Sequence, residues 1–484
     1  MFLADRASRR TSTALALVVL LAGFLLWLIP LDRYPSFYED EVFFVLPALR
    51  AATGHPFTYA VTSAAPFEQV AWGYHGPLLP RLLELLFHLF GYSVRLSRLP
   101  NVAGGWAAVA LMVLFLGRRG YRYAGLVLAV LWCGDRATQE LLYARMDGLA
   151  LLWLVVAFLL LRRAVEPGAA RVEMAMAACG VFCGLAVMTN PICAVFPVVL
   201  GGFLLMARRP RPFVMLCVGG LLSLPLLFSL WGGPIPEAWA QLRWHSARLN
   251  ADSFWSSFAI MLQVLRWSRY WFAALGLFGL AVVGWLGVRL VKRDLLETPE
   301  TRDLAVLALF TLAAVPCVLH RSTHPYYWVY FSVWPMAFLA ILLERQRRQG
   351  VTVLVLVALP WLASAAWTGL RLREAMRYRR QLGGDFLQRL VDEDVPQGQR
   401  LLTTPKLYSV PLRAGRPDFE VTSWFAEDVD TCPKCYLLMT EGDYEAALFI
   451  PRDDLNRREV LYAGGAFPGA VQMEYPIVLL GPER

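Results

Sequence analysis

Three consecutive acids, Glu39, Asp40 and Glu41, are the residues of this chain best suited to chemistry. They lie shortly after the first long apolar run, Thr13 to Pro30. If that run crosses a membrane, a carboxylate beside it can act as a general base, which accepts the proton of an attacking hydroxyl group. The alternative is that the three acids form a solvated face, the common role of a charge run. Residues elsewhere in the chain must decide between these interpretations.

Three further groups of polar residues lie between apolar runs, and each contains cationic side chains. They are His75 with Arg98, Arg145 with Asp147, and the turn His320–Tyr327, which holds Arg321 and His324. Cationic side chains grouped in this way are donors that can bind an anionic ligand. The alternatives are a structural ion pair for Arg145 and Asp147, headgroup anchoring for the turn, and an aromatic belt for Tyr326 and Tyr327.

Asp147 opens a long apolar run and therefore lies close to the hydrocarbon boundary. An unpaired carboxylate buried there costs about 2 to 3 kcal/mol. Arg145 is its natural partner, although residues two apart on a regular helix do not face each other.

The composition indicates that helices in a membrane position these groups. Hydrophobic residues make up 57% of the 484 residues, and charged residues make up only 17%. Apolar runs of about 17 to 22 residues recur, and each is long enough to cross a bilayer as a helix. Strand-like alternation is missing from these runs, so we expect a helical bundle and not an outer-membrane barrel.

The net charge of +9 does not indicate a nucleic-acid partner, because the arginines lie in short clusters between apolar runs. Such clusters mark the cytoplasmic loops of membrane proteins. The first run ends without a small-x-small cleavage site, so we expect an uncleaved anchor. The chain is thus predicted to be a multi-pass protein of the plasma (inner) membrane with its N-terminus in the cytoplasm.

Counting spans between the arginine clusters predicts about eleven transmembrane helices. They cover residues 13–30, 99–117, 121–134, 147–161, 172–189, 191–207, 213–231, 269–288, 303–319, 326–343 and 351–370. The third and fourth are short for full spans. An odd number of crossings places the C-terminal segment outside, and it places nearly all the unusual polar residues in outer loops.

The first outer loop is long enough to contain structure of its own. Its residues 80–90 place Arg81, Glu84 and His88 on one face of a helix whose other positions are apolar. This pattern predicts an amphipathic helix that lies in the membrane interface.

The composition changes after Leu370. A charged helix is expected from Arg371 to Asp394, and short strand-like runs follow it, separated by Pro and Gly turns. The runs are Arg400–Thr404, Phe419–Ser423, Tyr436–Thr440, Val460–Ala463 and Val471–Leu480. We therefore predict a transmembrane domain, residues 1–370, and a small extracytoplasmic α/β domain, residues 371–484.

Cys432 and Cys435 differ from the other cysteines, which fall in or beside apolar runs and are expected to be small buried hydrophobes. Their Cys-Pro-Lys-Cys spacing allows a disulfide, a redox pair or half a zinc site. No His follows His324, which argues against zinc. A structural disulfide and free thiols both remain open.

The order of these motifs resembles the C-type glycosyltransferases (GT-C). The nearest branch contains the protein O-mannosyltransferases, the lipid A aminoarabinose transferases and the lipopolysaccharide galacturonosyltransferases, in glycosyltransferase families 39 and 83. The resemblance covers roughly residues 10–345. Its motifs are the acids after the first span, Pro77-Leu78, Arg98-Leu99-Pro100, Arg145-x-Asp147, Gly184-Leu185-Ala186 before Thr189-Asn190-Pro191, and His324 to Tyr327 before Trp334-Pro335.

The resemblance implies an inverting transfer of a sugar from a polyprenyl-phosphate donor to a lipid, glycan or protein acceptor at the outer membrane face. It makes Asp40 the general base, with Glu41 beside it. The residues that it implies for the donor phosphate are Arg145, Arg321, His324, His75 and Arg98, and those for the rest of the pocket are Asp147, Asn190 and Tyr327.

The chain departs from many of these relatives in two places, since Asn190 stands where they have Lys and His75-Gly76 stands where they have a basic residue before Pro-Leu. No cofactor is firmly implied. Some relatives use a divalent metal, for which His245 is a candidate ligand, although a lone His is more often structural.

Two rival functions are a lipid-linked glycan transporter or flippase and a non-catalytic membrane scaffold. A transporter would place ionisable residues at mid-membrane and would show internal repeats. Here the charges gather on one face and no repeat is evident. A scaffold would retain its function after Asp40→Asn.

Overall fold

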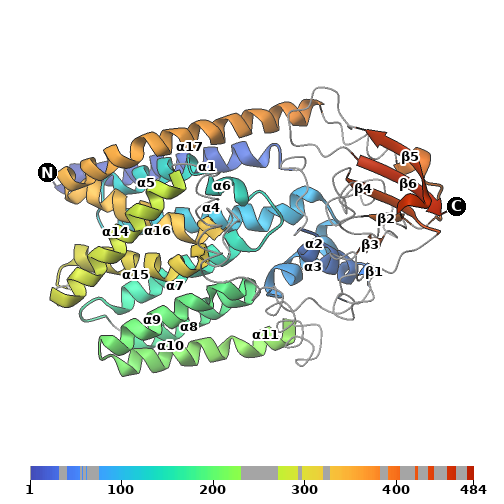
Figure 1. Ribbon diagram of the computed structural model, residues 1–484. Helices are drawn as coiled ribbons and strands as arrows, with labels where there is room; N and C mark the ends of the chain where they lie inside the picture. The colour runs from blue at the N-terminus through green and yellow to red at the C-terminus, as the bar shows by residue number, and fades with distance from the viewer. Residues whose placement is uncertain are drawn as a thin grey trace.

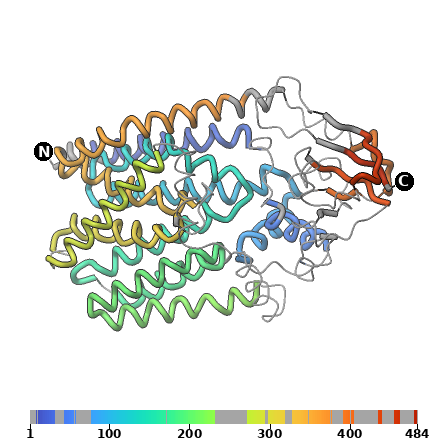
Figure 2. The backbone as a smooth tube through the Cα atoms, viewed as in Figure 1, coloured from blue at the N-terminus to red at the C-terminus, as the bar shows by residue number. Residues whose placement is uncertain are grey.

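The structure is a computed structural model in which apolar helices form a bundle and a small sheet lies at one end of it (Figure 1). It describes residues 2–31, 41–54, 57, 61–62, 76–169, 171–230, 271–292, 297–319, 327–381, 391–399, 401–403, 420–422, 434–440, 455–464 and 477–483. Figure 2 traces the backbone and shows the long helices running between the two ends of the bundle.

The helices account for most of the described residues. Their bounds are α1 (Phe2–Leu28), α2 (Glu41–Ala52), α3 (Leu78–Phe90), α4 (Val94–Arg118), α5 (Ala124–Cys133), α6 (Ala137–Glu140), α7 (Asp147–Ala164), α8 (Val172–Thr189), the 3₁₀ turn η1 (Pro191–Ala194), α9 (Val195–Met206), α10 (Pro210–Leu222), α11 (Leu224–Leu230), α14 (Trp271–Lys292), α15 (Pro299–Leu319), α16 (Trp328–Arg345) and α17 (Arg347–Gln381).

Every predicted span falls on one of these helices, and the chain is an integral multi-pass membrane protein. Within the described ranges, eight helical segments are long and apolar enough to cross a bilayer. The predicted count of about eleven is not confirmed, because three predicted spans fall on elements outside these eight segments. The third span falls on α5, the fourth on α7, and the sixth on η1 with α9. Of these, α5 has 10 residues and α9 has 12, which is short for a full crossing. Helix α7 has 18 residues, but these include Asp147, Arg162 and Arg163.

The two ends of the bundle differ in character. Successive long helices run in opposite directions, so the connections that carry the arginine clusters lie at the end where the N-terminus lies (Figure 1). We call this the basic end, and we call the opposite end, which faces the sheet, the sheet end. That the basic end faces the cytoplasm stays a prediction.

A buried ionic network closes the basic end. Asp303 of α15 is 1% exposed. It accepts hydrogen bonds from Arg162 Nε, from Arg119 Nε at 3.2 Å and from the Tyr121 hydroxyl at 2.9 Å. Glu166 accepts from Arg119 Nη1 at 2.6 Å. The network therefore ties the connection between α4 and α5 to α7 and α15.

Among the described residues, the sheet at the other end has six strands in the order β1-β3-β2-β4-β6-β5. The strands are β1 (Val61–Thr62), β2 (Leu401–Thr403), β3 (Glu420–Thr422), β4 (Tyr436–Thr440), β5 (Arg458–Gly464) and β6 (Ile477–Glu483). The pairs β1–β3, β3–β2 and β2–β4 are parallel, whereas β4–β6 and β6–β5 are antiparallel. All five predicted strand runs overlap a strand.

The predicted first outer loop, residues 31–98, contributes to this sheet, because β1 pairs with β3 through Val61 and Thr62. The boundary between predicted domains, at residue 370, stays a prediction. Cys435, at the start of β4, is disulfide-bonded, and the six cysteines of the helical region are free. Cys432 lies outside the described residues.

A second hydrophobic core joins the first outer loop to the C-terminal segment. Phe44 of α2 and Leu83 of α3 belong to the same buried cluster as Leu401 of β2 and Leu438 of β4. The predicted amphipathic helix of the first outer loop is α3, whose Leu79, Pro80, Leu83 and Phe87 are buried. The cluster thus fixes α2 and α3 between the bundle and the sheet.

Two details differ from the sequence analysis. Helix α2 was not predicted, since its apolar side chains find their partners only in the second core. The last span and the first part of the predicted charged helix form one helix, α17, which has 35 residues and ends at Gln381, while residues 382–390 lie outside the described residues. Arg371 and Arg373 are good helix formers, so the change in polarity does not interrupt the backbone hydrogen bonding.

Asp303→Asn should lower the free energy of unfolding by about 3 kcal/mol, because Arg162 and Arg119 would both lose the buried carboxylate to which they donate. Thermal unfolding of the purified protein in lipid nanodiscs measures this loss. Glu173→Gln is the matched control, since it removes an exposed carboxylate from the first turn of α8, also at the basic end. Equal melting temperatures for Asp303→Asn and the control would show that the network contributes nothing.

Candidate functional site

The described site residues gather at the sheet end of the bundle. Those that the structure describes are Glu41, Arg98, Arg145, Asp147, Asn190 and Tyr327. Asp40, His75, Arg321 and His324 lie outside the described residues, as does His245. The described residues of the site form two groups, one around Glu41 and one around the Arg145–Asp147 pair.

Glu41 and Arg98 form a bidentate ion pair with both side chains fully buried. Arg98 Nε donates to Glu41 Oε1 at 2.8 Å, and Arg98 Nη2 donates to Glu41 Oε2 at 2.9 Å. Bidentate pairs of this kind combine strong charge-assisted bonds with a fixed geometry. Glu41 is the first residue of α2, where the helix dipole also favours a negative charge.

The pair also binds backbone groups of two other segments. Arg98 Nη1 donates to the carbonyl oxygen of Leu31, just beyond α1, at 3.2 Å. The backbone N–H of Ala144, in the turn before α7, donates to Glu41 Oε1 at 2.5 Å. Four separate segments of the chain therefore meet at one buried pair. Asp40 is covalently joined to Glu41, so the acid cluster begins at this anchor.

Asn101 lies one turn after Arg98 on α4 and holds the same turn. Its Nδ2 donates to the carbonyl oxygens of Leu141 and Tyr143 at 3.1 and 3.0 Å, and its Oδ1 accepts from Gly148 N. A Cβ atom at Gly148 would lie 2.0 Å from the carbonyl oxygen of Asn101. Glycine at 148 is thus required for α7 to approach α4 this closely.

Asp147 is the centre of the second polar group. Its Oδ2 accepts from Arg145 Nε at 2.9 Å, which is possible because Arg145 lies in the turn before α7 and not on a regular helix. Its Oδ1 accepts from the Tyr330 hydroxyl at 2.9 Å and from Asn190 Nδ2 at 3.3 Å. Three of these four residues, Arg145, Asp147 and Asn190, were predicted for the site, and Tyr330 was not. All four are buried.

Tyr330 was missed by the sequence analysis, which singled out Tyr327 instead. Tyr327 packs against the main hydrophobic core, whereas Tyr330, one turn later on α16, reaches Asp147 and Asn190. The spacing of the two tyrosines could have identified Tyr330, since residues three apart on a helix lie on the same face and Tyr327 had been singled out. Asn190 also accepts from Ile192 N at 3.2 Å and so begins the turn η1.

Two further acids lie in the connection between α5 and α7. Burial raises the pKa of Asp135 to about 6, although Asp135 accepts hydrogen bonds from Ala137 N and from Trp271 Nε1. Burial, with a smaller contribution from Asp147, raises the pKa of Glu140 to about 7, against the opposing effect of Arg136 and Arg145. Glu140 is therefore a partly buried acid that titrates near neutral pH beside the Arg145–Asp147 pair.

No group of three His, Cys, Asp or Glu residues within the described ranges could hold a metal ion. Arg98 and Arg145, the two described arginines predicted to bind phosphate, each form an ion pair with a carboxylate. The described part of the site thus brings together the ends of α1, α2, α4, α7 and α16.

Comparison with solved structures identifies the fold. The crystal structure of ArnT from Cupriavidus metallidurans bound to undecaprenyl phosphate superposes with a TM-score of 0.54 at 13% identity, covering 96% of this chain and 98% of that one. The apo oligosaccharyltransferase of Archaeoglobus fulgidus superposes with a TM-score of 0.55 at 13% identity, covering 94% of this chain and 73% of that one.

A further structure shows the Archaeoglobus fulgidus oligosaccharyltransferase AglB in complex with an inhibitory peptide and a dolichol-phosphate. It superposes with a TM-score of 0.54 at 13% identity, covering 93% of this chain and 72% of that one. No protein-family model matches the chain, and no curated protein matches it in sequence. The chain therefore has the fold of the C-type glycosyltransferases, as its motif order indicated, and these identities establish the fold alone.

Arg98→Met should lower the free energy of unfolding by about 3 to 5 kcal/mol, because Glu41 would remain buried without the guanidinium group of Arg98. The double variant Glu41→Leu with Arg98→Met should lose less than Arg98→Met alone, since no unpaired charge is left. Thermal unfolding of the two variants in nanodiscs tests this coupling. A double variant that loses the sum of its two single losses would contradict it.

Glu140→Gln should reduce the pH dependence of stability. The ordinary pKa of this acid is 4.5 and the folded value is about 7. Between these values the unfolded chain has released a proton that the folded chain still holds, so stability falls as pH rises through 7. Melting temperatures from pH 4.5 to 8 should fall less steeply for Glu140→Gln than for the wild type. Parallel curves would refute the assignment, and Glu173→Gln is the control for an exposed acid.

Proposed function

We propose that the chain is an inverting glycosyltransferase that moves a sugar from a polyprenyl-phosphate donor to a hydroxyl or amine acceptor. The observation that carries the proposal is the place of the acid cluster. Within a C-type glycosyltransferase fold, Glu41 begins α2 at the sheet end, where the apolar helices stop and a polar network begins. An oily donor and a polar acceptor can both reach that boundary.

In the proposed reaction, a carboxylate oxygen of Asp40 accepts the acceptor's proton while the acceptor oxygen or nitrogen attacks C1 of the sugar. The bond between C1 and the phosphate oxygen breaks on the opposite face, so the configuration at C1 inverts. The polyprenyl phosphate leaves with the bonding electrons. One bond forms, one breaks, and the proton ends on Asp40.

The neighbouring residues divide into two groups in this proposal. Glu41 and Arg98 satisfy each other's charges, so they position the acid cluster and do not act on the substrate. The cations assigned to the leaving phosphate are Arg321, His324, His75 and Arg145, the last of which also donates from Nε to Asp147. Asn190 and Tyr330 keep Asp147 in place by donating to its second oxygen.

The donor class is supported by the neighbours, since ArnT is bound to undecaprenyl phosphate and AglB to a dolichol-phosphate in the structures that match. With the basic end in the cytoplasm, the sheet end lies outside the plasma membrane. The sheet, together with α2 and α3, then lies where a lipid, glycan or protein acceptor would approach.

Asp40→Asn should lower the transfer rate by about 10²- to 10⁴-fold, because the amide cannot accept the acceptor's proton. The assay is transfer by purified protein in nanodiscs, with a panel of polyprenyl-phosphate sugars. Binding of undecaprenyl phosphate should be unchanged.

Glu39→Gln is the matched control, since it removes a charge from the adjacent position. A fully active Asp40→Asn protein would exclude the proposed base. Equal losses for the two variants would point to a general effect of charge and not to a base at position 40.

A further inference from the structure

Helix α17 extends beyond the hydrocarbon of the bilayer at the sheet end. It runs along the outside of the bundle toward the sheet (Figure 1), and only 17% of its apolar part is buried within the protein. Its 35 residues reach about 52 Å, which exceeds the hydrocarbon thickness of about 30 Å. The apolar part ends at Arg373, and the helix continues to Gln381. The last turns of α17 therefore lie outside the hydrocarbon.

These last turns are strongly basic. Residues 371–381 contain five arginines and one glutamate. Arginines beside membrane spans normally gather on the cytoplasmic side, but the predicted orientation places this end of α17 outside. The positive-inside rule therefore does not explain these arginines, and a different role is required.

Two arginines from different segments meet on one tryptophan at this end. The guanidinium carbon (Cζ) of Arg371 lies 4.3 Å from the ring centre of Trp367, and that of Arg136, which precedes α6, lies 5.3 Å from it. Both distances suit a cation–π contact. The two cations repel each other, because their separation is below a Debye length, about 10 Å at 0.1 M salt. An anion bound to both would reduce that repulsion.

Polar contacts with α17 fix the backbone on both sides of Arg136. Ser364 Oγ accepts from Arg136 N at 3.0 Å and donates to the carbonyl oxygen of Gly134 at 2.8 Å. Gln139 Nε2 donates to Thr368 Oγ1, one turn further along α17, at 3.3 Å. The connection between α5 and α6 is thus held against α17, which keeps the side chain of Arg136 beside this helix.

The neighbouring side chains place the arginines at the headgroup level of a bilayer. Leu359 and Leu362 of α17 are 76% and 54% exposed, as expected for side chains that face hydrocarbon. Trp367, about one turn closer to the sheet end, is partly exposed, and tryptophan is enriched where headgroups meet hydrocarbon. Arg371 and Arg373 follow within two turns. A lipid with its acyl chains along the leucines would therefore have its headgroup beside the arginines.

The arginines suit an anionic headgroup in particular. Arginine binds phosphate through a planar fork of N–H groups, and basic residues next to a membrane attract anionic lipids. Arg136 and Arg371 are both partly exposed, so a ligand can reach them. A zwitterionic headgroup would bring a further cation to a place where two cations already repel each other, so an anionic phospholipid is favoured.

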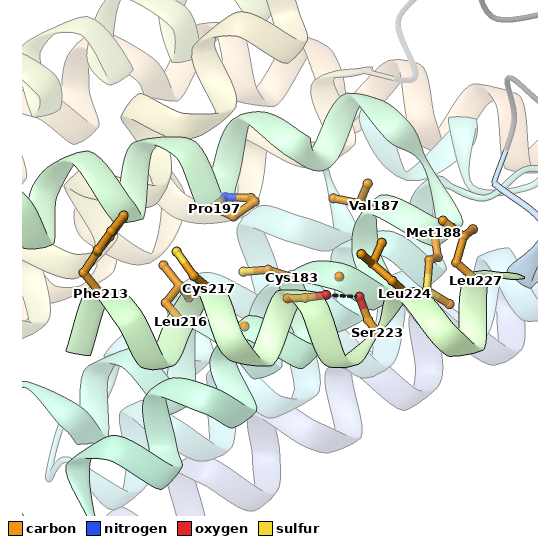
Figure 3. A pocket seen from close by; sticks show the side chains of 13 residues that line it. Cys183, Val187, Met188, Pro197, Phe213, Leu216, Cys217, Ser223, Leu224 and Leu227 are labelled. Carbon is orange, nitrogen blue, oxygen red and sulfur yellow. Dashed lines mark hydrogen bonds between the residues drawn. The ribbon is translucent and has the colours of Figure 1, made fainter. Parts of the chain in front are cut away.

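A cavity in another part of the bundle lacks this chemistry. It measures about 230 Å³ and lies between α8, α9 and α10–α11 (Figure 3). Its lining contains no charged side chain, and the hydroxyl of Ser223 in it donates to the carbonyl oxygen of Gly220 at 2.6 Å. A charged headgroup would find no cation there.

We propose that Arg136, Arg371 and Trp367 bind the headgroup of an anionic phospholipid, whose acyl chains lie along the exposed face of α17. This lipid is neither the donor nor the acceptor, so the inference does not depend on the proposed function. By neutralising both arginines, the lipid stabilises the contact between α17 and the connection from α5 to α7. That connection leads to the Arg145–Asp147 pair.

Arg371→Gln and Arg136→Gln test the headgroup site. Binding of phosphatidylglycerol to the purified protein, measured by native mass spectrometry, should weaken about fivefold for each variant. Arg371→Lys should lose less, because lysine keeps the charge but not the planar fork. Arg289→Gln is the matched control and should bind as the wild type does. Arg289 makes the same kind of contact with Trp285, at 5.5 Å, but on α14 and at the basic end.

A second measurement uses the wild-type protein and does not depend on whether a variant folds. Phosphatidylglycerol with a photoreactive headgroup, in nanodiscs, should label the peptides that contain Arg136 or residues 367–373. Phosphatidylcholine with the same photoreactive group should label these peptides less.

Four outcomes would overturn the inference. Folded variants that bind phosphatidylglycerol as the wild type does, or labelling spread evenly over both ends of the bundle, would exclude the site. Equal labelling by the two lipids would show that no anion is preferred. Competition by inorganic phosphate at the same concentration as phosphatidylglycerol would assign the arginines to a soluble anion. A dimer that Arg371→Gln dissociates, with lipid binding unchanged, would assign this surface to a second copy of the chain.

Discussion

The sheet end of this protein depends on the buried ion pair between Glu41 and Arg98. Removing two charges from water costs several kcal/mol per ion, and only close attraction with complete hydrogen bonding offsets that cost. The pair meets this condition by its bidentate geometry and by its bonds to Leu31 and Ala144. Movement of any of the four segments would leave a buried charge without its partners. The end of α1, the start of α2, α4 and the turn before α7 therefore keep fixed relative positions.

The same physical rule organises the rest of the bundle. At the basic end, Asp303 receives hydrogen bonds from Arg162, Arg119 and Tyr121, and apolar packing fills the space between the two ends. At the sheet end, Asp147 distributes its two oxygens among Arg145, Tyr330 and Asn190. Ionic contacts thus lie at the ends of the spans, where their desolvation costs least, and the middle of the bundle is left to hydrocarbon-like contacts.

The C-terminal sheet is linked to the acid cluster through the first outer loop. Strand β1 of that loop pairs with β3, and α2 shares a hydrophobic core with β2, β4 and β6. Since α2 begins at Glu41, the sheet contributes to the position of Glu41. The spans and the strand runs could be predicted because each is a local pattern. Helix α2 and strand β1 could not, since their partners are up to several hundred residues away in sequence.

The sequence by itself determined that this is a membrane-embedded helical bundle with a small C-terminal sheet, because hydrophobic length and strand-like runs are properties of contiguous residues. Its motif order also indicated the C-type glycosyltransferase fold. Only the tertiary structure decided which polar groups satisfy one another: Arg98 turns to Glu41 and Tyr330, not Tyr327, reaches Asp147. Such pairing follows from how helices pack in three dimensions, since a buried charge takes the partner that folding brings within hydrogen-bonding distance.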